Sequence, residues 1–381
     1  MGHFLDNTFC CRVVTNAQWA HIGYMSHKEL PDKSKLTSGT ARDFGGAPIA
    51  MAENSQLSKY SELGKPTEEW EEFYAAHADE VPVLVGSPEH MRKIMVDLKQ
   101  RAQSQVSPIT EGLKVHDVQM PTSDGASISL RIYQPMSEET LRPGLFYVHG
   151  GGWTLGDLEG EDLTCRAMCV RAGVVVVSVD YRLAPEHPFP RGTEDSWEAL
   201  QWTVKNQKDL RIRENSLIIG GSSSGGHTTA VLSHRVKNGS LLIKGSIMRI
   251  PSVCHIDRYP PHLGLHSLEE LKDAPLLSKR SMELFYGYLN PPDTSDPEAS
   301  PLLNPSFLGH PPTYLQVAGM DPLRDEGLAY ADKLRNAGVP VKVDVYPGLP
   351  HAFGYFPKLT AAKKNADDLI SGIKWLLAGA R

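Results

Sequence analysis

The sequence predicts an α/β protein with a largely parallel sheet that helices cover on both faces. From about residue 113 onward, apolar runs typical of strands alternate with runs of helical pattern, which is the element order of a parallel sheet. The run at residues 174–179 is apolar almost throughout, as expected of a strand that is buried on both faces. A glycine-rich turn at residues 221–225 joins one strand to the next helix, and this turn is where we look for chemistry.

The elements follow one another in a regular order along this part of the chain. Strands at residues 115–120 and 128–133 are joined by a turn at residues 123–125, and the second strand alternates apolar with polar side chains. Further strands are expected at residues 145–148, 174–179, 217–219, 314–317 and 341–346. Helices are expected at residues 163–172, 196–205, 226–236, 325–336 and 360–377.

Two segments outside this alternation predict a helical cap. Residues 66–69 (PTEE) and 87–89 (SPE) are good helix starts, so residues 61–112 are expected to form N-terminal cap helices. An insertion at residues 252–290 carries further helical pieces and is expected to join the cap. Residues 1–60 show no firm periodicity and are interpreted as an N-terminal extension. Residues 113–381 form the main domain, which contains the insertion.

Composition excludes several classes of protein. The 381 residues carry a formal net charge of -6, so there is no basic excess to suggest nucleic-acid binding. No apolar run approaches the length of a membrane span, and stable membrane insertion is not expected. Residues 1–16 lack a basic head followed by an apolar core, so no targeting signal is predicted.

The cysteines indicate a reducing compartment. Five cysteines in 381 residues form no recognisable disulfide framework, and a cytoplasmic location is the simpler expectation. Cys165 and Cys169 lie one helical turn apart and could begin a metal site. No matching Cys or His pair lies nearby, so a buried helix face is the preferred interpretation. No metal ion or organic cofactor is expected.

The strongest local signal is the strand-to-helix turn at residues 221–225 (GSSSG). Glycines at both ends allow a tight turn that projects the central hydroxyl, Ser223, above the sheet. A phosphate cradle at a helix N-terminus is the alternative, but the lysine of a Walker-type loop is missing. The turn therefore predicts Ser223 as a nucleophile.

A hydroxyl nucleophile needs a base and a group that orients the base. Asp321 and His351 each follow a later strand, in the order Ser, Asp, His that a strand–turn–helix nucleophile of this kind requires. Asp325 is the rival of Asp321, but its position at a helix start fits a helix N-cap.

Acyl transfer also needs donors for the developing oxyanion. Residues 149–153 (HGGGW) directly follow the strand at residues 145–148, and glycines let bare backbone N–H groups approach a carbonyl oxygen. Ser224 follows the nucleophile and is expected to supply a further backbone N–H. A flexible turn is the structural alternative for the three glycines.

As a set, these motifs resemble the hormone-sensitive-lipase-like branch of the α/β-hydrolases, a group of carboxylesterases and lipases. The resemblance rests on residues 149–153, residues 180–186 (DYRLAPE), the Ser223 turn and the Asp321 and His351 loops. It implies an eight-stranded, mostly parallel sheet with a helical cap. It also implies an oxyanion hole from the N–H groups of Gly150, Gly151 and Ser224. Ser222 and Ser224 depart from the usual Asp and Ala of this pattern.

The expected function is hydrolysis of a small or medium-chain carboxylic ester through a Ser223–His351–Asp321 triad and an acyl-enzyme. The partner is then a small-molecule ester, and Trp153 is expected to contact it; a homodimer is left open. An amidase, acyltransferase or cyclase would use the same machinery, because the cap decides the substrate. A non-catalytic small-molecule receptor is disfavoured, since His351 is present.

Overall fold

The structure is a computed structural model that describes residues 58–136, 141–237 and 241–380. The predicted extension at residues 1–60 therefore lies outside the described residues, apart from residues 58–60. The strands are β1 (Leu113–Pro121), β2 (Ser127–Pro135), β3 (Arg142–Val148), β4 (Val175–Asp180), β5 (Ile212–Ser222), β6 (Gly245–Arg249), β7 (Thr313–Met320) and β8 (Val341–Pro350). The α-helices are α1 (Glu68–His77), α2 (Pro88–Gln105), α3 (Asp162–Ala172), α4 (Arg191–Lys205), α5 (Ser224–Val236), α6 (Ser267–Glu270), α7 (Lys279–Leu289), α8 (Arg324–Asn336) and α9 (Thr360–Leu377).

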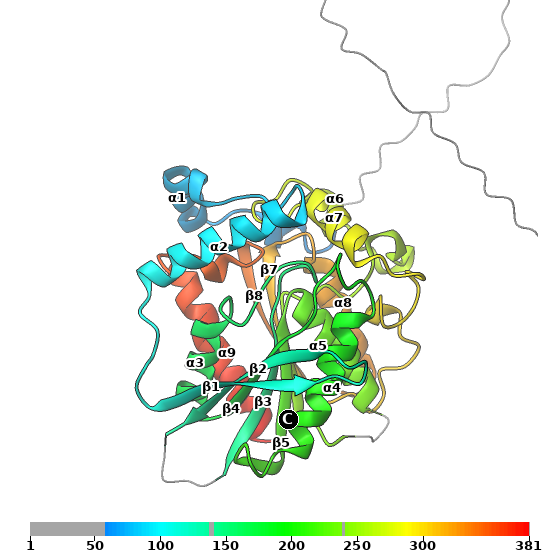
Figure 1. Cartoon of the computed structure of the whole chain (residues 1–381). Coiled ribbons are helices and arrows are strands. Elements are labelled where there is room, and N and C mark those ends of the chain that lie inside the picture. The colour runs from blue at the N-terminus through cyan, green and yellow to red at the C-terminus, as the bar shows by residue number, and fades with distance from the viewer. Residues whose placement is uncertain (1–57, 137–140, 238–240, 381) are drawn as a thin grey trace, which may run out of the picture. The chain divides into compact units, whose positions relative to one another are not determined.

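The strands form one eight-stranded sheet in the order β1-β2-β4-β3-β5-β6-β7-β8 (Figure 1). Strand β2 pairs antiparallel with β1 and with β4, and all remaining pairs are parallel. The carboxyl ends of the parallel strands therefore meet at one edge of the sheet. In such sheets, ligands bind outside this edge.

Helices cover both faces of the sheet, as the sequence predicts. Side chains from α3 and α9 pack with one face of the central strands. Helices α4 and α5 pack on the opposite face, where α8 joins α5 over β6 and β7 (Figure 1). Alternate residues of β3 show the division, since Leu145 and Tyr147 face α3 and α9 while Phe146 and Val148 face α4 and α5. This alternation sets which side of the sheet each residue near the strand ends can reach.

The sequence patterns missed strand β6. Its five residues, Gly245–Arg249, are too short and too mixed to stand out, although the family resemblance implied an eighth strand. The strand forms because β5 and β7 offer it a parallel partner on each side. Helix α4 also begins five residues earlier than expected, at Arg191 rather than residue 196.

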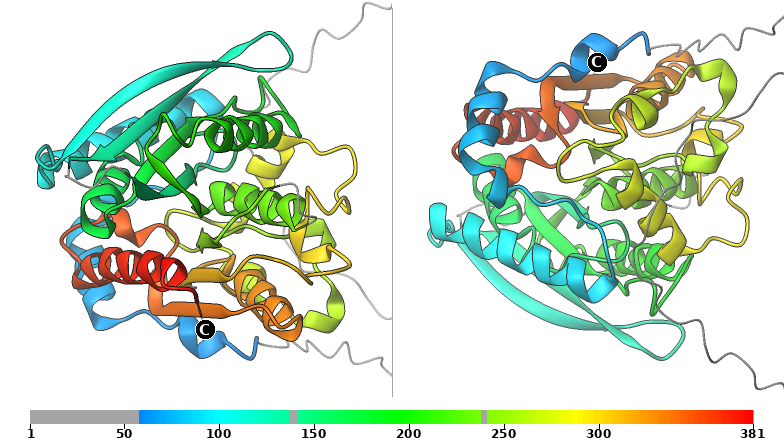
Figure 2. Two further views of the ribbon diagram at one scale, coloured as in Figure 1. Left: turned by 90° about the horizontal axis from the view of Figure 1, so that it is seen from below. Right: turned by 90° about the horizontal axis from the view of Figure 1, so that it is seen from above.

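Helices α1, α2, α6 and α7 lie over the edge where the central strands end, and Figure 2 shows the same helices from above. A backbone hydrogen bond links the N-terminal segment to the insertion: the N–H of Leu84 donates to the carbonyl of Leu276 at 3.2 Å. Arg92 of α2 donates to the carbonyl oxygen of Thr154 at 3.0 Å, in the turn after β3. The segments predicted to form a cap thus contact each other and the turn that follows β3.

None of the described helices is long and apolar enough to cross a membrane. The three described cysteines, Cys165, Cys169 and Cys254, are free and buried. Cys165 and Cys169 face the core from α3, as the helix-face interpretation predicts. No cluster of metal-ligating side chains occurs among the described residues.

A chain of buried polar groups links α5 to α8. The hydroxyl of Tyr330 lies 3.0 Å from Nε2 of His234 and 3.1 Å from Nε2 of His310. The Nζ of Lys237 lies 3.3 Å from Nδ1 of His234. Burial lowers the pKa of His310 to about 4, and burial with the nearby His310 and Lys237 lowers the pKa of His234 to about 2. Both imidazoles are therefore neutral in the folded protein at neutral pH.

We expect this cluster to make the protein acid-sensitive. The folded-state pKa of His310 lies below the ordinary 6.5, so the unfolded chain binds more protons as pH falls, and stability is lost below about pH 6.5. For His310 alone the loss is about 1.4 kcal/mol per pH unit down to its folded pKa. Between about pH 7.5 and about pH 5, the thermal unfolding midpoint should fall less in His310→Asn than in the wild type. The exposed His187→Asn is the control; equal pH effects in all three proteins would contradict the prediction.

Candidate active site

Ser223 occupies a strained turn between β5 and α5. Its backbone has φ 54° and ψ -117°, a conformation that residues other than glycine rarely adopt. Two backbone hydrogen bonds hold it there. The N–H of Ser223 donates to the carbonyl of Arg249 at 2.8 Å, and the N–H of His227 donates to the carbonyl of Ser223 at 3.0 Å. The turn at residues 221–225 thus has the form that the sequence predicts.

Glycines flank this turn because the backbone around them is crowded. A Cβ on Gly225 would lie 2.1 Å from the carbonyl oxygen of Val148, at the end of β3. A Cβ on Gly221 would lie 2.3 Å from the carbonyl oxygen of Gly225. Both separations are shorter than any real contact of that kind, so no larger residue fits without a backbone shift.

His351 and Asp321 complete a hydrogen-bonded chain with Ser223. Nδ1 of His351 lies 2.7 Å from Oδ2 of Asp321, and Nε2 lies 3.0 Å from Oγ of Ser223. Asp321 is 1% exposed and His351 is 6% exposed. An ionised carboxylate only accepts hydrogen bonds, so Nδ1–H donates to Asp321 and Nε2 is free to accept the Ser223 proton. The structure thus brings together the three residues that the sequence singled out.

Asp325 has a structural role in the described fold. It is not a helix N-cap, as expected from the sequence, because α8 begins at Arg324 and its N-cap is Leu323. Its carboxylate pairs with Arg324 at 2.8 Å and accepts the N–H groups of His266 and Ser267. Through these contacts, the Asp325 carboxylate holds α6 against α8.

The turn at residues 150–152 passes close to Ser223. A Cβ on Gly150 would lie 3.3 Å from Cβ of Ser223, and the carbonyl of Gly151 accepts the N–H groups of Thr154 and Leu155. Burial raises the pKa of Glu161, and Arg249, Thr164 and the backbone N–H of Gly150 act in the opposite direction.

Trp153 is more buried than a substrate contact requires. Its side chain is 4% exposed, and its indole N–H donates to Nδ1 of His227 at 3.3 Å. Its ring lies 5.0 Å from that of Tyr286 on α7. Trp153 thus packs α7 against α5, and its contact with substrate stays a prediction.

The ends of strands β7 and β8, which directly precede Asp321 and His351, pack against the chain just before α1. A Cβ on Gly319 would lie 2.1 Å from the carbonyl oxygen of Leu63, and one on Gly348 would lie 2.3 Å from that of Lys65. The same segment is anchored by Glu270, which accepts from the Ser61 hydroxyl at 2.7 Å and pairs with Arg324 at 2.8 Å. The chain before α1 therefore packs on the ends of both strands.

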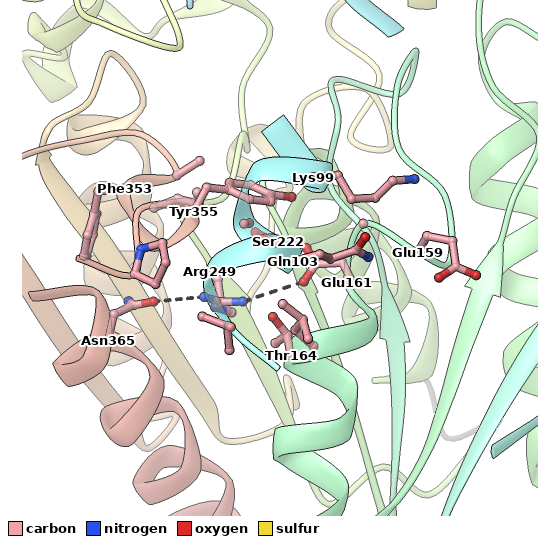
Figure 3. Close-up of a pocket in the computed structure, with 18 of the residues that line it drawn as sticks. Lys99, Gln103, Glu159, Glu161, Thr164, Ser222, Arg249, Phe353, Tyr355 and Asn365 are labelled. Atoms are coloured by element: carbon pink, nitrogen blue, oxygen red, sulfur yellow. Dashed lines mark hydrogen bonds and ion pairs between the residues drawn. The ribbon is translucent and has the colours of Figure 1, made fainter. Parts of the chain in front are cut away.

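Sequence analysis did not identify a pocket beside the nucleophile turn that contains charged side chains. The pocket has a volume of about 140 Å³, and Figure 3 shows Arg249 on its wall between Asn365 and Glu161. Tyr355, which follows the His351 loop, lines it from another side. An arginine at the end of an apolar strand was the available signal, but the strand itself, β6, escaped notice.

The glycine at position 225 offers a direct test of the turn. Gly225→Ala should lower the thermal unfolding midpoint by at least about 5 °C, because its Cβ meets the Val148 carbonyl and the backbone must move. Gly287→Ala is the matched control, since a Cβ there meets nothing within 4 Å and alanine favours the helix. A midpoint for Gly225→Ala equal to or above that of the wild type would refute the close-packing argument.

Comparisons with known proteins agree with this geometry. A family model described as alpha/beta hydrolase fold matches residues 145–354. The versiconal hemiacetal acetate esterase of Dothistroma septosporum is 32% identical over 303 residues, which span 78% of this chain and 90% of that protein.

Two solved structures are similar over almost their whole length. The crystal structure of vibralactone cyclase matches with a TM-score of 0.77 and 31% identity, covering 84% of this chain and 97% of the cyclase. A thermostable carboxylesterase cloned from a metagenomic library matches with a TM-score of 0.71 and 31% identity, covering 78% and 98%. Relatives named esterases and carboxylesterases identify the chain as an ester-hydrolysing enzyme. The chain belongs to the hormone-sensitive-lipase-like branch of the α/β-hydrolase family.

Proposed function

We propose that the protein is a serine carboxylesterase that hydrolyses small or medium-chain esters through Ser223, His351 and Asp321. The observation that carries the proposal is the hydrogen-bonded chain from Asp321 through His351 to Ser223, at 2.7 Å and 3.0 Å. Its members come from the ends of three different parallel strands. A purely structural cluster would have no need of a strained serine at its end.

The proposed reaction follows from this geometry. Nε2 of His351 accepts the Ser223 proton as Oγ attacks the ester carbonyl, and Asp321 stabilises the imidazolium that forms. His351 then protonates the departing alcohol. Water hydrolyses the acyl-enzyme by the same steps, and Ser223 is regenerated.

We assign the oxyanion site to the backbone N–H groups of Gly150, Gly151 and Ser224. Ser224 is the first residue of α5, so its N–H has no partner within the helix, and the helix dipole favours negative charge there.

We also propose that α1, α2, α6 and α7 act as a cap that limits substrate size. In support, Phe285 of α7 lies against the glycine turn, because a Cβ on Gly152 would be 2.4 Å from its ring. The cap thus contacts the turn that we assign to the oxyanion. The cytoplasmic location and the homodimer stay predictions.

A cyclase is the second candidate, and the similarity to vibralactone cyclase favours it over an amidase or an acyltransferase. An acyl-enzyme that is attacked by a nucleophile of its own acyl chain gives a ring instead of an acid. The same triad serves both reactions, because only the attacking group differs. A non-catalytic receptor has less support, since His351 is hydrogen-bonded to Ser223.

Substitution of the triad tests the proposal. On p-nitrophenyl esters of increasing acyl length, Ser223→Ala and His351→Ala should each lower kcat/KM by at least about 1,000-fold, because each removes a member of one reacting unit. A fluorophosphonate probe should label the wild type and not Ser223→Ala. The exposed Ser371→Ala is the control and should behave as the wild type. Retained hydrolysis in Ser223→Ala would overturn the assignment, and labelling without hydrolysis of any ester would favour the cyclase.

A second pair of variants tests the choice of acid. Asp321→Asn should lower kcat by about 1,000- to 10,000-fold, because an amide cannot hold His351 in the tautomer that accepts the serine proton. Asp325→Asn should lower the unfolding midpoint and leave kcat per folded molecule within about threefold, because its carboxylate contacts α6 and Arg324 and not His351. A larger loss of kcat in Asp325→Asn than in Asp321→Asn would reverse the assignment.

A further inference from the structure

A buried arginine–glutamate pair lies directly beside the nucleophile turn. Arg249 ends β6, and its Cα is the register partner of Ser222, the residue before the nucleophile. The side chains of Arg249 and Glu161 are 15% and 8% exposed. Ionised groups this buried are uncommon unless they are paired, so the position of both beside the catalytic turn calls for a physical reason.

Neutral acceptors hold Arg249 in place. Its Nε, Nη1 and Nη2 donate to Gln316 at 2.9 Å, to the Tyr147 hydroxyl at 3.2 Å and to Asn365 at 2.9 Å. These bonds occupy three of the five N–H groups of a guanidinium. The plane of the guanidinium is therefore fixed while part of its donor capacity remains.

The charged partner of Arg249 is too distant for a direct hydrogen bond. Nη1 of Arg249 and Oε2 of Glu161 are 4.0 Å apart. Direct bonds of this type measure about 2.7–2.9 Å, whereas one oxygen atom between the two groups could bond to both. A bridging oxygen would have to accept from Arg249 and donate to Glu161. A hydroxyl group or a water molecule meets both requirements, and a carboxylate or ether does not.

The pair faces a pocket that adjoins the reacting groups. The pocket is lined by Ser222 and Ala352, the immediate neighbours of Ser223 and His351 (Figure 3). A second pocket contains Gly150 and shares Glu161 and Tyr355 with the first. The volume of about 140 Å³ is close to that of a cavity known to admit a group of benzene size. This adjacency is the basis for placing an arm of a substrate bound at Ser223 near Arg249 and Glu161.

We propose that this pocket is a substrate subsite that binds a hydroxyl-bearing arm of the ester, with the hydroxyl between Arg249 and Glu161. The inference rests on the proposed esterase function and names its substrate class. A plain alkyl arm would displace water from the pair and leave donors and acceptors unsatisfied. A carboxylate arm would meet the Glu161 carboxylate and Glu159 at the same pocket. Lys99 also lines the pocket, but its ammonium group is already paired with Asp157 at 2.8 Å. The subsite therefore selects a hydroxyl over both.

Matched substrates provide the test. One series is p-nitrophenyl esters of an acid of about four to six carbons, with a terminal methyl, hydroxyl or carboxylate group. A second series is acetate esters of the corresponding alkanol, diol and hydroxy acid, so that each arm of the ester is tested. We expect kcat/KM for the hydroxyl member to exceed both others by at least about 10-fold in one series.

Variants then assign the preference to the pair. In Glu161→Gln and Arg249→Met, the ratio of kcat/KM for the hydroxyl and methyl substrates should fall toward 1. Because this ratio compares two substrates on one protein, a general loss of activity cancels. Ser222→Asp should lower the same ratio, because a carboxylate beside Arg249 would take up its free donors. Glu298→Gln is the matched control; it breaks an ion pair with Arg235 on α5 and should leave the ratio unchanged.

Failure of the subsite can be separated from failure of the esterase proposal. Calorimetry with Ser223→Ala protein measures binding to the subsite without hydrolysis. The two ligands are the monoacetate of pentane-1,5-diol and the acetate of pentan-1-ol. If the alcohol arm enters the pocket, the diol ester should bind at least about 10-fold more tightly. The methyl esters of 5-hydroxypentanoate and pentanoate test the acyl arm in the same way. Three outcomes would each overturn the subsite. They are equal affinities in both ligand pairs, an unchanged hydroxyl-to-methyl ratio of kcat/KM in the Glu161 and Arg249 variants, and a preference for the carboxylate substrate. The absence of both probe labelling and hydrolysis would instead overturn the esterase.

Discussion

The close approach of helix α5 to the end of strand β3 is the constraint on which the site depends. Gly225 has the Val148 carbonyl where a Cβ would be, so the first turn of the helix can begin directly against the sheet. That contact, with the bond from Ser223 N–H to Arg249, holds the serine at its positive φ. The serine held in this way lies 3.0 Å from Nε2 of His351, and preorganisation of this kind would lower the barrier to the proposed reaction.

Two polar systems flank this turn. Asp321 and His351 directly follow β7 and β8, and the chain before α1 packs on the ends of both strands. Arg249 and Glu161 lie on the α3 and α9 face, where Ile218 and Ile247, which precede Ser222 and Arg249 on the same strands, pack in the core. The first system forms the hydrogen-bonded chain with Ser223, and the second lines the pocket beside the turn.

Prediction from sequence succeeded where the pattern was local. The apolar run at residues 174–179 and the glycines around Ser223 each have a cause within a few residues, and the structure has β4 and the tight turn there. It failed where the cause was distant. Strand β6 depends on pairing with β5 and β7, and Asp325 contacts α6, a segment more than fifty residues earlier. Neither partner is visible in the local pattern.

The sequence by itself determined the α/β class and the chain order of Ser223, Asp321 and His351. It could do so because strand and helix periodicity and tight-turn glycines are local consequences of backbone geometry. Only the tertiary structure decided that Trp153 is packed against His227 and that Arg249 and Glu161 face each other across a pocket. These pairings join residues 74 and 88 positions apart, and the packing of helices α3 and α5 against the sheet, which no single segment encodes, brings such residues together.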